Sequence, residues 1–217
     1  MSGGTSDSRP PRVTLFDYGA GNLHSLVKSL ERAGADVRVE TDPTAAVQDT
    51  DALVLPGVGA FASAVERLAP GREAMRDALA GGLPGLGICL GMQLLFDGSD
   101  EGAGAGLGLI PGRVTRIQAR RVPQIGWNTI EPAGEAGAHD PLLAVSGLSV
   151  AYYANSFVCR PRDDDASVVA WSQHEGDRFP AVVRHARTVG VQFHPEESSA
   201  PGVAMVEAFV RSLVPQP

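Results

Sequence analysis

The sequence predicts an α/β fold built on a central, mostly parallel mixed sheet with helices on both faces. Short apolar runs alternate with helical patterns through the first hundred or so residues, an order typical of covered parallel sheets. Hydrophobic residues make up 43% of the 217 residues, enough for a sizeable core. No internal repeat or long linker is evident, so we expect one domain at residues 12–214 after a disordered polar tail at residues 1–11.

The first half of the chain supplies the alternating pattern. The first elements expected in chain order are a strand at 13–16, a helix at 23–33, a strand around 37–39 and a short helix opened by Asp42 and Pro43. A buried strand then enters a glycine-rich loop within 51–61. One broken helix or two at 62–80, a strand at 83–88 and a helix at 90–96 follow. Asn22 is a suitable N-cap for the first helix and Gly34 a suitable stop. Proline is tolerated at a first helical position, which supports the short helix at Pro43.

The second half consists mainly of short strand candidates. Residues 97–108 are rich in glycine and acidic side chains and are expected to form a loop. The later elements expected are strands at 109–117, 150–159, 167–172, 181–185 and 188–193 and a final helix at about 202–213.

Charge and cysteine content exclude several classes of function. The formal net charge of -7 is spread along the chain and argues against binding nucleic acid or an anionic membrane. No apolar run approaches the roughly 18 residues of a membrane span, and from the polar N-terminal residues we expect no secretory signal. Cys89 and Cys159 show no metal-ligand spacing and are too few for a disulfide framework, so we expect a cytoplasmic protein without a metal or other cofactor.

Cys89 lies in a pattern that suits a nucleophile. The sequence Gly87-Ile88-Cys89-Leu90-Gly91 fits an elbow in which a strand turns abruptly into a helix. Glycine lets neighbouring backbone approach closely, and the helix N-terminus favours a thiolate. The N–H of Leu90 points the same way and is a candidate oxyanion donor. On this short motif alone, a buried structural cysteine is about as probable.

A candidate base and its orienting carboxylate occur near the C-terminus. His194 and Glu196 follow the last predicted strand, and side chains two residues apart share one strand face. A cysteine, an imidazole and a carboxylate repeat the nucleophile–base–orienter arrangement of acyl transfer. The alternative is that both residues are surface positions on a turn made by Pro195.

The third candidate element is the glycine-rich loop in LPGVGAF, residues 55–61. Loops at the ends of neighbouring parallel strands face one crevice, so the N–H groups of Val58 and Gly59 are candidates for a second oxyanion donor. Gly57 and Gly59 would let this loop change its peptide orientation. As a turn signal alone, Pro-Gly-x-Gly is common.

Together, PGVGAF, GICLGMQLLF and QFHPE resemble the class I (triad) glutamine amidotransferases. Within that family, DYGAGNLHSL, GLGLIPGRV, VPQIGWN and YYANSF resemble the glutaminase subunits of imidazole glycerol phosphate synthases. The resemblance implies a Cys89–His194–Glu196 glutaminase that releases glutamate and ammonia. The residues that it implies for binding glutamine are Gly57, Gln93, Tyr152, Asn155 and Ser156.

The resemblance also implies a partner. This is a (β/α)8-barrel cyclase subunit in a heterodimer, which uses the ammonia to make imidazole glycerol phosphate and an aminoimidazole carboxamide ribonucleotide. The interface residues implied are Asn22, Gln124, Trp127 and Glu197, although Trp127 is as readily read as a core residue. Gln124 and Asn155 stand where histidine is common, and Glu197 stands where lysine is usual, so the details of this contact are open.

Three other functions compete with this interpretation. Another class I glutaminase could serve a different synthase, for example in pyridoxal phosphate formation. A thiol hydrolase or peptidase on a similar sheet would share the elbow but need not carry His194 and Glu196. A non-catalytic interaction module would keep only the fold.

Overall fold

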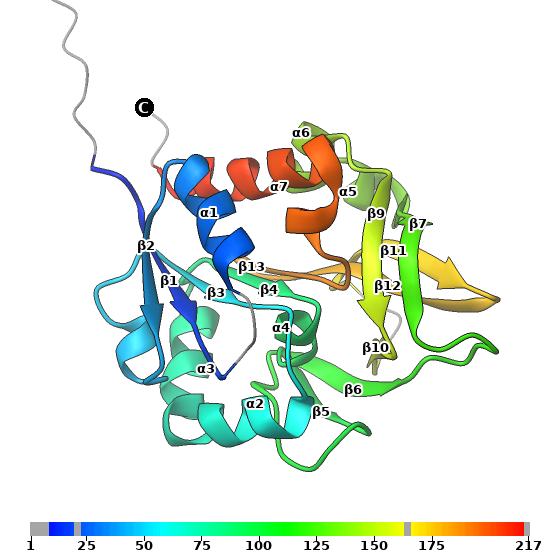
Figure 1. Ribbon diagram of the computed structural model, residues 1–217, viewed down its shortest axis with the longest axis horizontal. Helices are drawn as coiled ribbons and strands as arrows, with labels where there is room; N and C mark the ends of the chain where they lie inside the picture. Colours follow the sequence, from blue (N-terminus) through cyan, green and yellow to red (C-terminus); the bar gives the residue numbers. More distant parts are fainter. Residues whose placement is uncertain (1–8, 20–22, 163–165, 215–217) are drawn as a thin grey trace, which may run out of the picture.

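The structure, a computed structural model, describes residues 9–19, 23–162 and 166–214 (Figure 1). Its strands are β1 Arg12–Phe16, β2 Asp36–Glu40, β3 Ala52–Leu55, β4 Gly85–Ile88, β5 Phe96–Ser99, β6 Ile110–Arg116, β7 Gln124–Thr129, β8 Glu131–Pro132, β9 Val150–Asn155, β10 Phe157–Pro161, β11 Val168–His174, β12 Asp177–His185 and β13 Thr188–Val191. Its helices are α1 His24–Arg32, α2 Phe61–Leu68, α3 Arg72–Ala80, α4 Leu90–Gln93, α5 Gly134–Ala138, α6 Pro141–Ser146 and α7 Ser199–Arg211, with short 3-10 turns η1 Ala45–Val47, η2 Ala69–Gly71 and η3 Pro195–Glu197.

The central sheet confirms the predicted fold class. Its eight strands lie in the order β2-β1-β3-β4-β13-β12-β11-β8. Neighbours from β2 to β13 are parallel, and the pairs β13–β12, β12–β11 and β11–β8 are antiparallel. The carboxyl ends of β1, β3, β4 and β13 therefore meet at one edge of the sheet, where ligands bind in open α/β sheets.

Helices cover both faces of this sheet and enclose two apolar cores. Figure 1 shows α1 and α7 on one face and α2, α3 and α4 on the other. The strand β3 is buried on both sides: Ala52 and Val54 belong to the core with α1 and α7, and Leu53 and Leu55 to the core with α2 and α3. Such two-sided burial explains why this strand reads as a continuous apolar run instead of an alternating one.

Two smaller sheets extend the molecule beyond the central layer. The sheet β10-β6-β5 has three strands, and β7 pairs with β9 in an antiparallel ribbon. Figure 1 shows this ribbon beside β11 and β12, at the end of the molecule away from β2.

The predicted helix at 90–96 is wrong in its length. The helix α4 ends at Gln93, and Phe96 already belongs to β5. The carbonyl groups of residues 94–96 accept hydrogen bonds from the amides of residues 107–110, which lie within or just after the segment expected to be a loop. Non-local pairing therefore takes the acceptors that a longer helix would use.

Several other boundaries also differ from the prediction. The expected strand at 150–159 is two strands, β9 and β10, which turn at Ser156 into different sheets. The helix α7 starts at Ser199, not at residue 202. Asn22, the predicted cap of α1, and residues 1–8 of the predicted tail lie outside the described residues, whereas Arg9 forms an ion pair with Asp51.

The ribbon strand β7 and the helix α6 are absent from the sequence prediction. The side chain of Asp140 caps α6 by accepting from the amides of Leu142 and Leu143, Pro141 occupies the first turn, and Gly147 ends the helix with φ 63°. These signals are present in the sequence and are sufficient to predict the helix. By contrast, β7 exposes its apolar side chains Ile125 and Trp127 and buries only the polar Gln124, so its sequence lacks the pattern of a buried apolar face.

The turn from β4 into α4 depends on Gly91, and its replacement tests the fold. A Cβ at this position would lie 2.0 Å from the carbonyl oxygen of Leu55. The added Cβ is fixed to the backbone of residue 91 and the carbonyl belongs to the backbone of Leu55, so neither can rotate away. We therefore expect Gly91→Ala to lower the free energy of unfolding by about 1–3 kcal/mol. Urea denaturation measures the change, and Ser63→Ala on the exposed face of α2 is the control. An unchanged unfolding midpoint for Gly91→Ala would contradict this packing.

Candidate active site

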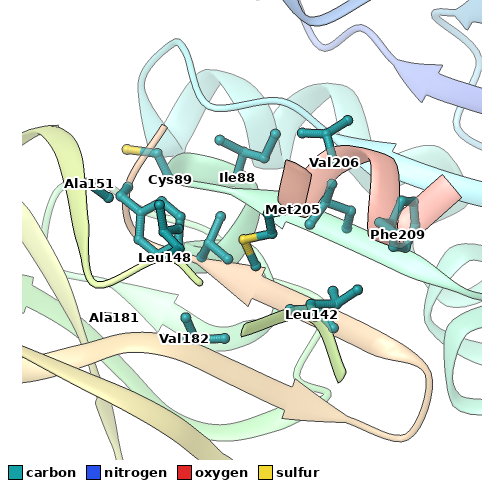
Figure 2. Packing of buried hydrophobic residues seen from close by; sticks show 14 of the residues in the cluster. Ile88, Cys89, Leu142, Leu148, Ala151, Ala181, Val182, Met205, Val206 and Phe209 are labelled. Carbon is teal, nitrogen blue, oxygen red and sulfur yellow. The ribbon is translucent and has the colours of Figure 1, made fainter. Parts of the chain in front are cut away.

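Cys89 stands at a sharp corner between β4 and α4. Its backbone has φ 46° and ψ -102°, a conformation that non-glycine residues rarely adopt, and its N–H donates to the carbonyl of Val191 at 2.7 Å. A Cβ at Gly87 would lie 2.7 Å from the carbonyl group of Gly91, so this corner requires glycine on both sides. Figure 2 shows the sulfur of Cys89 pointing away from Ile88 and from the core.

The short length of α4 changes one part of the sequence argument. With four residues, this helix makes little more than one turn. A macrodipole needs aligned peptides, so α4 gives a thiolate less support than the longer predicted helix would. Nearby side-chain donors must therefore provide more of that support.

The structure brings His194 and Glu196 to Cys89. Nδ1 of His194 lies 3.0 Å from Oε1 of Glu196. The imidazole also lies beside Cys89, since a Cβ at Gly57 would meet both Cε1 of His194 and Cβ of Cys89. Burial lowers the pKa of His194, but the hydrogen bonds and negative charges of Cys89 and Glu196 outweigh that effect and raise it to about 10. A protonated imidazole is therefore the favoured form of His194 at neutral pH.

The contact between His194 and Glu196 has a different origin from the one expected. The strand β13 ends at Val191, and Glu196 lies in the 3-10 turn η3, so strand alternation does not align the two side chains. Ser198 fixes this turn: its hydroxyl donates to the carbonyl of His194 at 2.6 Å and accepts from the amide of Tyr152 at 2.9 Å.

The loop after β3 is anchored directly behind the active site. The hydroxyl of Tyr18, after β1, donates to the carbonyl of Pro56, which also accepts from the amide of Gly91 at 3.1 Å. Burial raises the pKa of Tyr18 well above its usual value, which keeps this hydroxyl protonated as a donor. A Cβ at Gly57 would lie 2.8 Å from Cε1 of His194, so glycine is needed at this position too.

Two neighbouring pockets meet at this loop. A cavity of about 150 Å³ contains most of the predicted substrate and oxyanion residues; its lining is Gly57, Gly59, Cys89, Leu90, Gln93, Glu101, Ala154, Asn155, Ser156 and Phe157. A second cavity of about 280 Å³ is lined by residues that include Gly57, Val58, Tyr152, His194, Glu196 and Glu197. The structure thus places Val58 and Tyr152 in the second cavity, which shares Gly57 with the cavity that contains Cys89.

Three residues beside these pockets escaped the sequence analysis. Glu101 lines the smaller cavity, Ser198 holds the His194 turn, and Gln192 is buried with its amide next to Cys89. A polar side chain two residues before His194, between Val191 and Phe193, is a signal that could have identified Gln192. Glu101 and Ser198 carry no comparable local pattern.

The predicted interface residues are placed in different environments. Trp127 is 55% exposed, so the core interpretation of this tryptophan is wrong, and it packs edge-to-face on Tyr152 at a centroid distance of 6.2 Å. Glu197 is exposed, Asn22 lies outside the described residues, and Gln124 is buried opposite Asn155 in the β7–β9 ribbon. Gln124 therefore lies behind the exposed face of the ribbon.

Within the described ranges, no helix has the length and apolarity to cross a bilayer. The same part of the chain holds no cluster of three or more His, Cys, Asp or Glu side chains suited to a metal ion. Both cysteines are free and buried.

Comparisons with known proteins agree with this geometry. Residues 14–213 match the family described as Glutamine amidotransferase class-I. Imidazole glycerol phosphate synthase subunit HisH of Halobacterium salinarum is 42% identical over 211 residues, 93% of this chain and 94% of that protein. The subunit of the same name from Corynebacterium diphtheriae is 39% identical, with 92% and 98% of the two chains covered.

Solved structures share the fold at low sequence identity. A putative GMP synthase subunit from Thermoplasma acidophilum has a TM-score of 0.67 at 19% identity, with 95% of each chain covered. The structure of PurLQS from Thermotoga maritima gives 0.66 at 20% identity, covering 94% of this chain and all of that one. From the family match over most of its length, we conclude that the chain belongs to the class I glutamine amidotransferases.

Proposed function

We propose that the chain is the glutaminase subunit of an imidazole glycerol phosphate synthase. The full-length relatives that bear this subunit name support the proposal. The observation that carries the chemistry is the contact of Cys89 with His194, which is itself held by Glu196, beside a cavity of about 150 Å³.

In this proposal, Cys89 and His194 divide the acyl transfer between them. The thiolate attacks the side-chain carboxamide carbon of glutamine, and the carbonyl becomes an oxyanion. The His194 imidazolium gives its proton to the departing ammonia, and a carbon–sulfur thioester remains. His194, oriented by Glu196, then takes a proton from water, which attacks the thioester and releases glutamate.

The oxyanion needs donors that are already in place. The N–H groups of Leu90 and Gly59 are the first candidates, because both residues line the cavity that contains Cys89. Removing one such donor in other acyl-transfer enzymes costs roughly 3–4 kcal/mol of transition-state stabilisation. Val58 lies in the neighbouring cavity, and its N–H would reach the oxyanion only if the loop changes its peptide orientation.

Free glutamine carries charged groups that the cavity must recognise. Gln93, Asn155 and Ser156 supply neutral polar groups, and Glu101 is the carboxylate among the lining residues. One oxygen of Glu101 accepts from the amide of Phe61 at 3.2 Å, which fixes the side chain in place. We assign Glu101 to the α-ammonium group of glutamine by charge complementarity.

The exposed face of the β7–β9 ribbon is the proposed docking site for the (β/α)8-barrel cyclase subunit. Ile125 and Trp127 project from this face and are 67% and 55% exposed. Tyr152, on the same face, also lines the larger cavity next to His194. A cyclase seated here would cover this opening and receive the ammonia without its passing through bulk water.

Replacing the nucleophile tests the chemistry. Cys89→Ala should lower glutamine-dependent synthesis by about 10³-fold or more, and adding His194→Ala should cost little more, because the two residues act as a unit. The assay couples glutamine hydrolysis to product formation in the presence of the cyclase and its nucleotide. Cys159→Ala, the other buried cysteine, is the matched control and should keep most of the activity. Robust turnover by Cys89→Ala would refute the proposal, and activity only with a different synthase would point to another class I glutaminase.

The charge of Glu196 should set the alkaline limit of activity. This carboxylate helps to raise the pKa of His194, so Glu196→Gln should lower that pKa, and the imidazolium should be lost at lower pH. We expect the alkaline limb of the pH profile of kcat/KM to move to lower pH by about 1–3 pH units. Glu207→Gln, on the exposed face of α7, is the control. A limb that stays in place would show that Glu196 does not influence the imidazole.

Truncating Trp127 should weaken the partner complex without unfolding the chain. Exposed aromatic side chains often dominate interfaces, and such truncations cost about 2 kcal/mol or more. We therefore expect Trp127→Ala to raise the Kd of the complex with the cyclase at least about tenfold, as measured by calorimetry. Val145→Ala, an exposed apolar position on α6, is the control. Equal Kd values for the two variants would remove the ribbon from the interface.

A further inference from the structure

The buried side chain of Gln192 makes a contact that packing does not explain. It directly follows β13 and is 0% exposed, although glutamine is seldom fully buried. Its backbone N–H donates to the carbonyl of Ala181 at 2.9 Å, so the residue is fixed in the sheet. Its Nε2 lies 3.5 Å from Sγ of Cys89, a normal distance for an N–H···S hydrogen bond. A buried amide must find partners, and here the sulfur is one of them.

Neighbouring groups fix which end of this amide faces the sulfur. The carbonyl of Phe157 can only accept, and Nε2 of Gln93 donates to it at 3.1 Å. The same nitrogen carries a second hydrogen, which points to Oε1 of Gln192 at 3.5 Å. Turning the Gln192 amide over would set its NH2 against that of Gln93 and its oxygen against the sulfur. The chain from Phe157 through Gln93 therefore directs N–H toward Cys89.

We propose that Gln192 is a further catalytic residue, which donates a hydrogen bond to the sulfur of Cys89 in its thiolate form. The donor is neutral, so it supports negative charge on sulfur without competing with His194 for the role of proton donor. It also replaces support that the short helix α4 cannot give. This role rests on one part of the proposed function, namely that Cys89 is the nucleophile.

The hydrogen bond should act at both ends of the acyl transfer. Before attack, it raises the fraction of Cys89 present as thiolate and holds the sulfur in place. When the carbon–sulfur bond forms, the sulfur becomes a neutral thioester, and the hydrogen bond weakens. When water attacks and this bond breaks, the sulfur leaves with the electron pair as a thiolate, which Gln192 again stabilises. Hydrogen bonds to charged groups are the stronger ones, so the first step gains a larger fraction of thiolate and the second gains a better leaving group.

The charge on Cys89 also responds to other groups, and a test must hold them constant. Within the described part of the chain, the titratable side chains near Cys89 or its cavity are His194, Glu196, Tyr18, Cys159 and Glu101. All of them remain unchanged in variants of Gln192. Alkylation by iodoacetamide needs no glutamine, so its pH dependence reports on the sulfur even if glutamine were not the substrate.

The experiment measures the rate of alkylation of Cys89 against pH, with the modified peptide identified by mass spectrometry. Gln192→Met keeps the length but removes the N–H, and the midpoint of the rising limb should move up by about 1 pH unit, a tenfold loss of thiolate at a given pH. Gln192→Glu replaces the donor with a carboxylate and should move the midpoint of the rising limb to still higher pH. Gln173→Glu, the same change on the exposed face of β11, should leave the midpoint in place.

A purely structural role predicts a different result. It would lower the thermal stability of the Gln192 variants while leaving the alkylation midpoint at its original pH, and that outcome would overturn the proposal. Gln192→Asn keeps the amide but shortens its reach, and should shift the midpoint in the same direction if Gln192→Met fails to fold. In the unsubstituted protein, the side-chain amide proton resonances of Gln192 should move when Cys89 is alkylated. If these resonances do not move, the proposal that Gln192 donates to Cys89 would also be overturned.

Discussion

The active site depends on how closely backbone can approach backbone behind Cys89. Gly91 lies against the carbonyl of Leu55 with no room for a Cβ, and its amide donates to the carbonyl of Pro56. This contact joins the corner after β4 to the loop after β3, so the position of the sulfur and that of the glycine-rich loop are set together. The positive φ of Cys89 is maintained because the surrounding parallel strands fix both of its neighbours.

A second layer of polar contacts determines the charges at this corner. His194 is held from one side by Glu196 and from the other by Cys89, and the turn that carries it is tied to β9 through Ser198. Because β9 also carries Tyr152, the strand that supports the imidazole belongs to the exposed ribbon. The proposed docking face and the imidazole of His194 are therefore connected by one strand and one serine.

Most of the first half of the fold could be predicted from local pattern. Apolar runs, helical spacing and glycine stops predict β1, β3, β4 and the flanking helices, because each of these elements buries a continuous face. The errors occur where non-local pairing overrides the local signal, as in α4, whose continuation is replaced by β5. The ribbon strand β7 was missed because it exposes its apolar side chains Ile125 and Trp127, so the usual pattern of a buried strand face is absent.

By itself, the sequence predicted a nucleophile at Cys89, a base at His194 and an orienting carboxylate at Glu196, because Gly-x-Cys-x-Gly and His-Pro-Glu are local patterns with a specific chemical use. Only the tertiary structure decided that Val58 and Tyr152 line a different cavity from Cys89, that Gln124 is buried, and that Glu101 and Gln192 stand beside the site. The physical reason is distance along the chain. Gln192 and Cys89 are 103 residues apart, and they touch only because β13 and β4 pair side by side in the sheet.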